Sequence, residues 1–319
     1  MIKPIYIKHP NLWHYTTAAG LVGILRTQEL WSTNFRYLND EEELSGFFQR
    51  KFPEILQAGL DEGLKTLSET VEGNDFLLKV GGVEHLKSVT FNMLNESISK
   101  VTLKMDLYVT SFSCTNQGQE GDGLLSQWRG YGHDGGYAMV FDTKGLFDLL
   151  KKERDDYQHF LLNFSSVDYH YAGWMSNKDR NNEAVVWESA IKDAVANLLV
   201  NGNLKDQILA LVVPMLSLAM RHKHKGFEEE REVRISVLRF PDQSQPKKSI
   251  NFYNRSGVLV PYISLFDGST AKTRSLPVKE IVIGPHPDKL KRKQAVEVLL
   301  RELELNIPVR VSDIPYLGR

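Results

Sequence analysis

Two short stretches near opposite ends of the sequence hold side chains suited to chemistry. His14 lies in "LWHYTTAAG", and Glu230 and Glu232 lie in "GFEEEREVRI". An imidazole changes charge close to neutral pH, and an ionised carboxylate stabilises positive charge that develops beside it. In a strand, Glu230, Glu232 and Arg234 share one side because side chains alternate with a period of two. Two carboxylates and a guanidinium in line cost free energy if they are buried, unless they pair or serve a site.

Both stretches also have a purely structural interpretation. A lone histidine such as His14 is more often a hydrogen-bonded core residue than a catalytic one. The acidic run is equally consistent with an exposed strand edge on which Glu and Arg side chains pair, because such residues are mostly solvated. From these residues alone, the two interpretations remain open.

The middle of the chain offers a candidate binding surface. "LSQWRGYGHDGGYAMVFD" places Trp128, Arg129 and Tyr131 beside a glycine-rich turn. Aromatic rings with a guanidinium make a platform for a flat ring that carries an anionic group. The alternative is that Trp128 is a core residue. Further on, "RHKHKGF" holds two histidines at a spacing that sends their rings to different helix faces, so we interpret it as a solvated basic helix end and predict no metal site.

Composition limits the class of protein. The 319 residues carry a formal net charge of −1, so the chain has no global basic field for duplex nucleic acid, although a local basic groove is compatible with it. The single cysteine, Cys114, excludes an internal disulfide and a cysteine-based zinc site. No apolar run approaches the roughly 20 residues needed to cross a bilayer. We therefore expect a cytoplasmic protein that does not enter the membrane.

The hydrophobic patterns predict strands scattered among helices. A strand over 12–15 leads into a helix that Thr16 or Thr17 caps, and Asn39 and Asp40 are plausible caps of a later helix. Without strict alternation of strands and helices, the pattern predicts an α+β fold. We expect one domain over 1–319, with helical insertions at about 41–105 and 143–225. The other expected strands fall at 29–33, 106–115, 135–142, 160–172 and four places after 230, and the other expected helices at about 125–131, 143–155, 181–224 and 287–304.

As a set, these segments resemble a bacterial family catalogued as domain of unknown function 2971. The segments that carry the resemblance are "LWHYTTAAGLVGILRTQELWSTNFRYLNDEEE", "SFSCT", "LSQWRGYGHDGGYAMVFD", "KHKGFEEEREVRI", "VKEIVIGPHP" and "VRVSDIPYL". That family in turn looks like a remote branch of the ADP-ribosyltransferase superfamily. The resemblance implies a split mixed or antiparallel sheet core with helical insertions.

The superfamily resemblance implies roles for particular residues. His14-Tyr15-Thr16 matches the histidine and hydroxyl residue of the first core strand, with Tyr15 where many relatives have glycine. Glu230-x-Glu232 matches the acidic pair that enters a late core strand. In this interpretation Glu232, His14 and Glu230 are catalytic. The residues expected to contact NAD are Tyr15, Thr16, Tyr37, Asn39, Trp128, Arg129 and Tyr131, with Tyr37 and Tyr131 as alternative stacking partners of nicotinamide.

The implied activity is transfer of ADP-ribose from NAD to a macromolecule, with single-stranded RNA or DNA as the expected acceptor. The resemblance also suggests a toxin or antiphage effector that an antitoxin protein neutralises. Two alternatives stay open: a non-catalytic nucleotide-binding sensor or scaffold in a defence system, and an NAD glycohydrolase that uses water as the acceptor.

Overall fold

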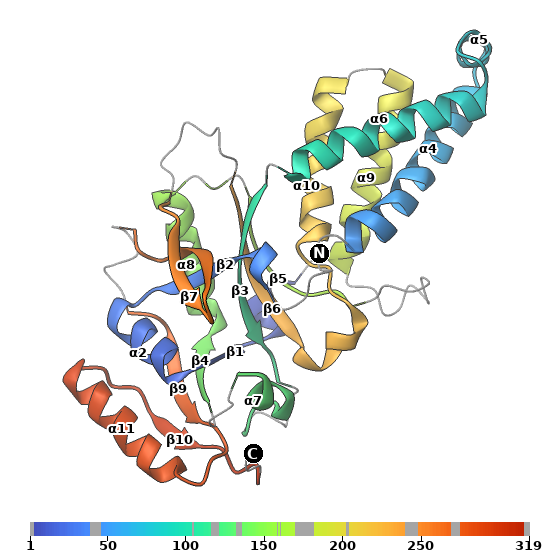
Figure 1. The fold of residues 1–319 in the computed structure, drawn as a ribbon. Coiled ribbons are helices and arrows are strands. Elements are labelled where there is room, and N and C mark those ends of the chain that lie inside the picture. Colours follow the sequence, from blue (N-terminus) through green and yellow to red (C-terminus); the bar gives the residue numbers. More distant parts are fainter. Residues whose placement is uncertain are drawn as a thin grey trace.

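The protein is built around one ten-stranded mixed sheet (Figure 1). Its structure, a computed structural model, describes residues 3–38, 46–103, 105–115, 121–131, 136–157, 159, 161–169, 182–201, 204–239, 248–268 and 275–315. Eight strands follow the order β10-β9-β4-β1-β3-β2-β8-β7, and β6 and β5 continue from β3. Of the paired strands in these ranges, β10 and β9 are parallel and the other pairs are antiparallel. The strands are β1 (Asn11–Thr16), β2 (Leu30–Asn34), β3 (Asp106–Ser113), β4 (Tyr137–Asp142), β5 (Leu161–Ser166), β6 (Glu232–Arg239), β7 (Asn251–Arg255), β8 (Val258–Leu265), β9 (Val278–Ile283) and β10 (Val309–Val311).

Strand β3 is the point at which the sheet divides. Along one edge it pairs with β6 over its whole length. The other edge is shared, because β1 pairs with β3 at Ser113 and β2 pairs with it at Tyr108 and Val109. Between these two pairings a side chain links β3 to β2, because the Thr110 hydroxyl donates a hydrogen bond to the carbonyl oxygen of Trp31. The division opens the sheet beside residues 110–112.

One face of the sheet is covered by three helices, α2 (Ala18–Thr27), α8 (Thr143–Asp156) and α11 (Lys289–Glu302) (Figure 1). Their apolar side chains pack on every second residue of the strands, because alternate side chains point to the same face. Leu12, Phe112 and Ile235 are examples from the strand side of this core. The short helix α1 (Ile5–Lys8) adds Ile5 to the same core.

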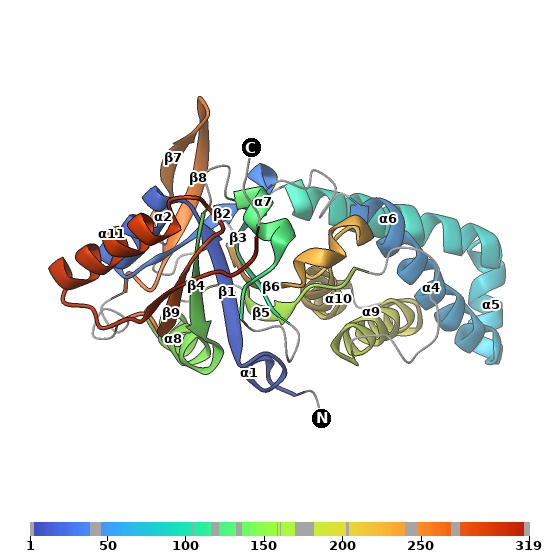
Figure 2. The same ribbon diagram turned by 90° about the horizontal axis from the view of Figure 1, so that it is seen from below.

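The opposite face is covered at one end by the short helix α7 (Leu125–Tyr131), which packs Trp128 against Trp13 and Tyr15. At the other end stands a helical bundle with a core of its own (Figures 1 and 2). Two separate segments of the chain build it. Its helices are α4 (Phe52–Ser68), α6 (Val83–Leu103), α9 (Asn182–Asn201) and α10 (Leu204–Ala219). A shorter helix, α5 (Val71–Lys79), joins α4 to α6. The remaining described elements are the short helical segments η1 (Phe35–Tyr37), η2 (Phe47–Lys51) and η3 (Lys225–Glu230).

The predicted α+β class is confirmed, and the strands and helices fall near their predicted ranges. Thr17, and not Thr16, caps α2, because its hydroxyl accepts a hydrogen bond from the amide of Gly20. The predicted insertion at 143–225 is only partly a helical addition, because α8 packs on the sheet and β5 pairs with β6. The predicted caps Asn39 and Asp40 lie outside the described residues. Among the described helices, none has both the length and the apolar character needed to cross a membrane.

Candidate functional site

A cavity of about 450 Å³ lies over the divided part of the sheet. Alternate residues of β2, β6 and β7 line it, and consecutive residues of β1 and β3 line it where these two strands separate. Residues of η3 and α7 also contribute to the lining. The lining residues are Trp13, His14, Tyr15, Thr17, Trp31, Thr33, Leu38, Val109, Thr110, Ser111, Phe112, Ser113, Gln127, Lys223, Phe227, Glu230, Glu232, Arg234, Tyr253 and Arg255. The volume and the mixture of aromatic, polar and charged side chains suit a small organic ligand.

A cluster of ion pairs lies on one side of the cavity. Arg234 grips Glu232 with two donors: Nε lies 2.6 Å from Oε1, and Nη2 lies 2.8 Å from Oε2. Lys223 Nζ lies 2.8 Å from Oε2 of Glu232 and 2.7 Å from Oε2 of Glu230. Lys223, Glu232 and Arg234 are all buried. The negative charges of the two carboxylates equal the positive charges of the two cations, and buried charges are tolerated when they are paired in this way.

The backbone around Glu232 explains this convergence. Arg231 adopts a left-handed conformation, with φ of 45°, between the end of η3 and the start of β6. This turn lets Glu230 and Glu232 both reach Lys223, although only Glu232 belongs to the strand. The amide of Glu232 also donates to the hydroxyl of Tyr169 over 2.7 Å. The acid is therefore held through both its main chain and its side chain.

Glu232 stays ionised in this position. Burial alone would raise the pKa of its carboxyl, but the charges of Arg234 and Lys223 and their hydrogen bonds outweigh burial and lower the pKa to about 2. A permanently negative group therefore faces the cavity at neutral pH. Three donors already occupy its two oxygens, however, which leaves limited capacity for a further hydrogen bond.

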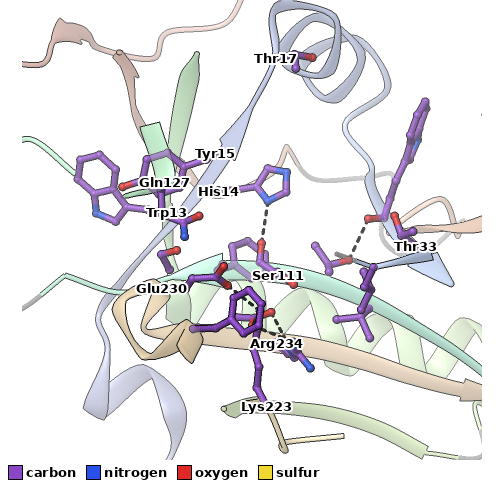
Figure 3. Close-up of a pocket in the computed structure, with 18 of the residues that line it drawn as sticks. Trp13, His14, Tyr15, Thr17, Thr33, Ser111, Gln127, Lys223, Glu230 and Arg234 are labelled. Carbon is purple, nitrogen blue, oxygen red and sulfur yellow. Dashed lines mark hydrogen bonds and ion pairs between the residues drawn. The ribbon is translucent and has the colours of Figure 1, made fainter. Parts of the chain in front are cut away.

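His14 lies where β1 and β3 separate. Its Nδ1 is 3.0 Å from the carbonyl oxygen of Ser111, and Figure 3 shows the ring pointing toward that residue. A carbonyl only accepts hydrogen bonds, so Nδ1 carries the proton. Burial lowers the pKa of His14, while the bond to Ser111 opposes that shift. The neutral ring then presents Nε2 as a hydrogen-bond acceptor.

The α7 end of the cavity is a packed aromatic unit. The Tyr15 hydroxyl accepts a hydrogen bond from the amide of Leu124, and Trp128 Nε1 donates to the carbonyl of Asp122. The rings of Tyr15 and Trp128 meet edge to face at 4.8 Å. Gly123 fits between them with φ of 78°, and a Cβ there would lie 2.7 Å from the Tyr15 hydroxyl. Burial also raises the pKa of Tyr15, so its hydroxyl stays protonated.

The structure does not bring all of the predicted residues to the cavity. His14, Tyr15, Glu230 and Glu232 line it. The predicted platform at Trp128 is wrong: the indole is 1% exposed and packs in the core, so its ring faces are covered.

The other predicted cofactor contacts do not line the cavity or cannot be placed. Arg129 is exposed and, like Thr16 and Tyr37, is not among the described lining residues. Tyr37 instead accepts a hydrogen bond from Arg255 through its backbone carbonyl. Asn39 and the side chain of Tyr131 lie outside the described residues.

The solvated helix end expected at residues 221–227 is wrong for its first three residues, although residues 224–226 are exposed. Arg221, His222 and Lys223 are buried. Burial, together with Lys51 and Arg50, lowers the pKa of His222 to about 4. The segment turns inward because the amide of Lys223 donates to the carbonyl of Asp168, beside β5. This brings Lys223 to the acidic pair.

Several lining residues were missed by the sequence interpretation. They are Trp31, Gln127, Lys223, Phe227, Tyr253 and Arg255. No local signal marks Trp31, because Leu30 and Trp31 are adjacent apolar residues and alternation does not say which of them faces the core; in the structure Leu30 and Ser32 are buried and Trp31 points the other way. The others depend on how distant segments pack. Within the described part of the chain, no group of three or more His, Cys, Asp or Glu residues could hold a metal ion.

Comparisons with known proteins find one family model that matches part of the chain, and its description gives no activity. No curated protein and no solved structure matches the chain. Residues 127–235 of the 319 match the family model described as protein of unknown function (DUF2971). This segment contains α7 from Gln127 onward, together with Lys223, Glu230, Glu232 and Arg234. The part of the chain that supplies the ion-pair cluster is therefore similar to the DUF2971 family, as the sequence motifs indicated.

Proposed function

We propose that the cavity binds NAD⁺ and that the protein transfers ADP-ribose to a macromolecular acceptor. One observation carries the proposal: His14 from the first strand and Glu232 from a late strand line the same cavity. The resemblance to ADP-ribosyltransferases expects this pair of residues. Nothing in the local sequence requires the two segments to meet.

The side chains that line the cavity suit a dinucleotide. Flat rings can stack on Trp31, Phe227 or Tyr253, and Arg255 supplies positive charge for phosphate oxygens. Ser111, Ser113 and Gln127 add groups that form hydrogen bonds with ribose hydroxyls or an amide. A volume of about 450 Å³ falls within the range of small-molecule sites, although a whole dinucleotide would extend toward the open side of the cavity.

In this proposal Glu232 supplies electrostatic stabilisation. NAD⁺ supplies a glycosidic bond whose cleavage returns the bonding electrons to nicotinamide and leaves positive charge on the ribose. The ionised carboxylate of Glu232 faces that charge, and Arg234 and Lys223 keep the carboxylate ionised and in place. His14 holds a ribose hydroxyl through its acceptor nitrogen. Glu230 lies close enough to Lys223 to draw it away from Glu232 when a ligand binds.

The acceptor that we favour is single-stranded RNA or DNA. A near-neutral chain can bind single strands, because base stacking supplies much of the affinity. A biological role as a toxin or antiphage effector, with a neutralising antitoxin protein, rests on the family resemblance alone.

A second candidate has its own supporting observation. Arg234 and Lys223 already occupy the oxygens of Glu232, as expected of a structural ion pair. A site of this kind could bind a nucleotide without reacting, as a sensor or scaffold. It predicts that NAD⁺ raises the melting temperature of the protein and is recovered intact.

The test is incubation of the full chain with NAD⁺ labelled in its ADP-ribose part. Released nicotinamide is measured, and the label is followed into fractionated protein, RNA and DNA. Transfer predicts nicotinamide together with a labelled macromolecule. Free ADP-ribose as the sole labelled product would instead indicate a glycohydrolase, and intact NAD⁺ with thermal protection would indicate the binding module.

The variants must respect the ion-pair cluster. Glu232→Ala would leave Lys223 and Arg234 as excess buried positive charge, so we choose Glu232→Gln combined with Lys223→Met, which removes one charge of each sign. This double variant should lose nicotinamide release while still unfolding cooperatively. Glu229→Gln, on an exposed neighbour outside the described cavity lining, is the matched control and should keep full activity. Full activity of the folded double variant would contradict the assignment of Glu232.

A further inference from the structure

The cavity contains an exposed tryptophan in an unusual position. Trp31 lies in β2, between β3 and β8 in the middle of the sheet order. Its neighbours Leu30 and Ser32 are fully buried, but Trp31 is 44% exposed. Interior strands normally bury large apolar side chains, because burial of an aromatic ring stabilises the fold strongly. An indole left open here is consistent with a ligand that covers it.

Two tyrosines support this indole. Tyr262 of β8 stacks on Trp31 with ring centroids 4.2 Å apart and planes inclined by 28°. The ring centroid of Tyr253, in β7, lies 5.7 Å from that of Trp31 and 5.9 Å from that of Tyr262. We call Trp31, Tyr253 and Tyr262 the aromatic shelf. Three rings from three adjacent strands hold one another in place, so the shelf loses little conformational entropy when a ligand binds.

The shelf belongs to the same cavity as the ion-pair cluster. Trp31 and Tyr253 line it together with Thr33, which follows on the same side of β2. The hairpin of β7 and β8 projects beyond the rest of the sheet (Figure 2) and carries Arg255 on the same face as Tyr253. The Nη2 atom of Arg255 donates to the carbonyl oxygen of Tyr37 over 2.6 Å, which holds the guanidinium beside the shelf.

We propose that the aromatic shelf is a stacking site for a nucleobase and that Arg255 contacts the phosphate attached to it. Every base offers a flat π-face to an aromatic ring, and guanidinium matches the geometry of phosphate oxygens. A purely apolar ligand would not use the adjacent cation. A sugar without a base would not need three supporting rings.

The nucleobase has two possible sources, which share this chemistry. One is the adenine of NAD⁺, and the other is a base of a single-stranded acceptor. Assignment to either source rests on the proposed function. The stacking itself does not, because it requires no reaction.

The experiment measures binding of adenosine monophosphate and of a short single-stranded oligonucleotide to the full chain by calorimetry. Ribose 5-phosphate serves as the probe that lacks a base. Trp31→Ala should weaken the binding of the base-containing probe by roughly 10-fold or more, since stacking of one base contributes that much. Tyr253→Phe keeps the ring and should bind nearly normally. Phe252→Ala is the matched control, because Phe252 is 61% exposed on the other side of the same strand.

Each result has a defined meaning. Trp31-dependent binding of adenosine monophosphate supports the adenine of NAD⁺ as the source of the base, and Trp31-dependent binding of the oligonucleotide alone supports a base of a single-stranded acceptor. The proposal is overturned if neither probe binds, if ribose 5-phosphate binds as well as they do, or if Trp31→Ala, shown to be folded by urea titration, binds the probes like the natural chain. Trp31-dependent base binding without any nicotinamide release would overturn the proposed function and leave the shelf standing. Normal nicotinamide release with no base binding at the shelf would overturn the shelf and leave the proposed function standing.

Discussion

Lys223 Nζ lies 2.8 Å from Oε2 of Glu232, and both residues are buried. Lys223 lies shortly after α10, a helix of the bundle, whereas Glu232 is the first residue of β6 in the sheet. This ion pair therefore links the bundle to the sheet at the floor of the cavity. Removal of one partner of this ion pair should lower the free energy of unfolding strongly, because the charge that remains is buried without compensation.

Glu232→Gln should destabilise the protein by about 3–5 kcal/mol, since it leaves Lys223 and Arg234 close together with one acid fewer between them. The free energy of unfolding from urea titration measures this. Glu232→Gln combined with Lys223→Met should recover part of the loss, because the cluster is then balanced again. A double variant less stable than the single one would show that the pair acts through packing and not through charge.

The same pair makes stability depend on acid. The pKa of Glu232 in the folded protein, about 2, lies below its ordinary value of 4.5, so the ion pairs stabilise the fold fully above about pH 5. Their contribution decreases as the pH falls toward 2, where the folded carboxyl takes up its proton. The advantage of the natural chain over the double variant should therefore decrease steadily from pH 5 to pH 3 in urea titrations, without vanishing by pH 3. A constant difference across that range would contradict the lowered pKa.

Local alternation predicted that Glu230, Glu232 and Arg234 share one side of a strand. This is confirmed for Glu232 and Arg234, which lie in β6 and form a bidentate pair, but it is wrong for Glu230, which belongs to η3. Local alternation could not predict Lys223. The "RHKHKGF" segment has the composition of a solvated helix end, and only the packing of residues 221–223 beside β5 turns it inward. Sequence patterns report which face a side chain takes, but they do not report which distant element covers that face.

The two tryptophans Trp128 and Trp31 show the same limit. Trp128 lies beside glycines in a polar stretch and was a plausible exposed platform, yet α7 buries it against Trp13 and Tyr15. Trp31 lies in the short strand β2 and was not among the predicted site residues, yet it is open to the cavity. For the residues that we propose as catalytic, the family resemblance named His14 and Glu232, and the topology of β1, β3 and β6 explains how they reach one cavity.

Gly123 is expected to be indispensable to the α7 end of the cavity. An alanine there would be strained at φ of 78°, and its methyl group would lie 2.7 Å from the Tyr15 hydroxyl and 3.0 Å from Trp128 Nε1. Gly123→Ala should lower the free energy of unfolding by roughly 1–3 kcal/mol. Near-ultraviolet circular dichroism should also change, because the packing of Tyr15 against Trp128 is disturbed.

Gly130, in α7, is the matched control. A Cβ at this position would meet nothing within 4 Å. Alanine also favours a helix over glycine, so Gly130→Ala should be neutral or stabilise the protein by up to about 1 kcal/mol. Equal losses from the two substitutions would mean that the loop before α7 is not held in the manner described.

His14 provides the last prediction, which concerns the pH dependence of function. Burial lowers its pKa below the ordinary value of 6.5, so the ring is neutral at pH 7, with Nδ1 donating to Ser111 and Nε2 left as an acceptor. Protonation would turn Nε2 into a donor, which cannot accept a bond from a ribose hydroxyl. Nicotinamide release should therefore be constant from pH 8 to 6.5 and should fall at lower pH. Glu232 does not contribute to this fall, because its carboxyl titrates at about 2. His14→Gln has no titrating ring, so whatever activity it retains should lose the inflection. An inflection above pH 6.5 in the natural chain, or one that survives in His14→Gln, would show that another group controls the reaction.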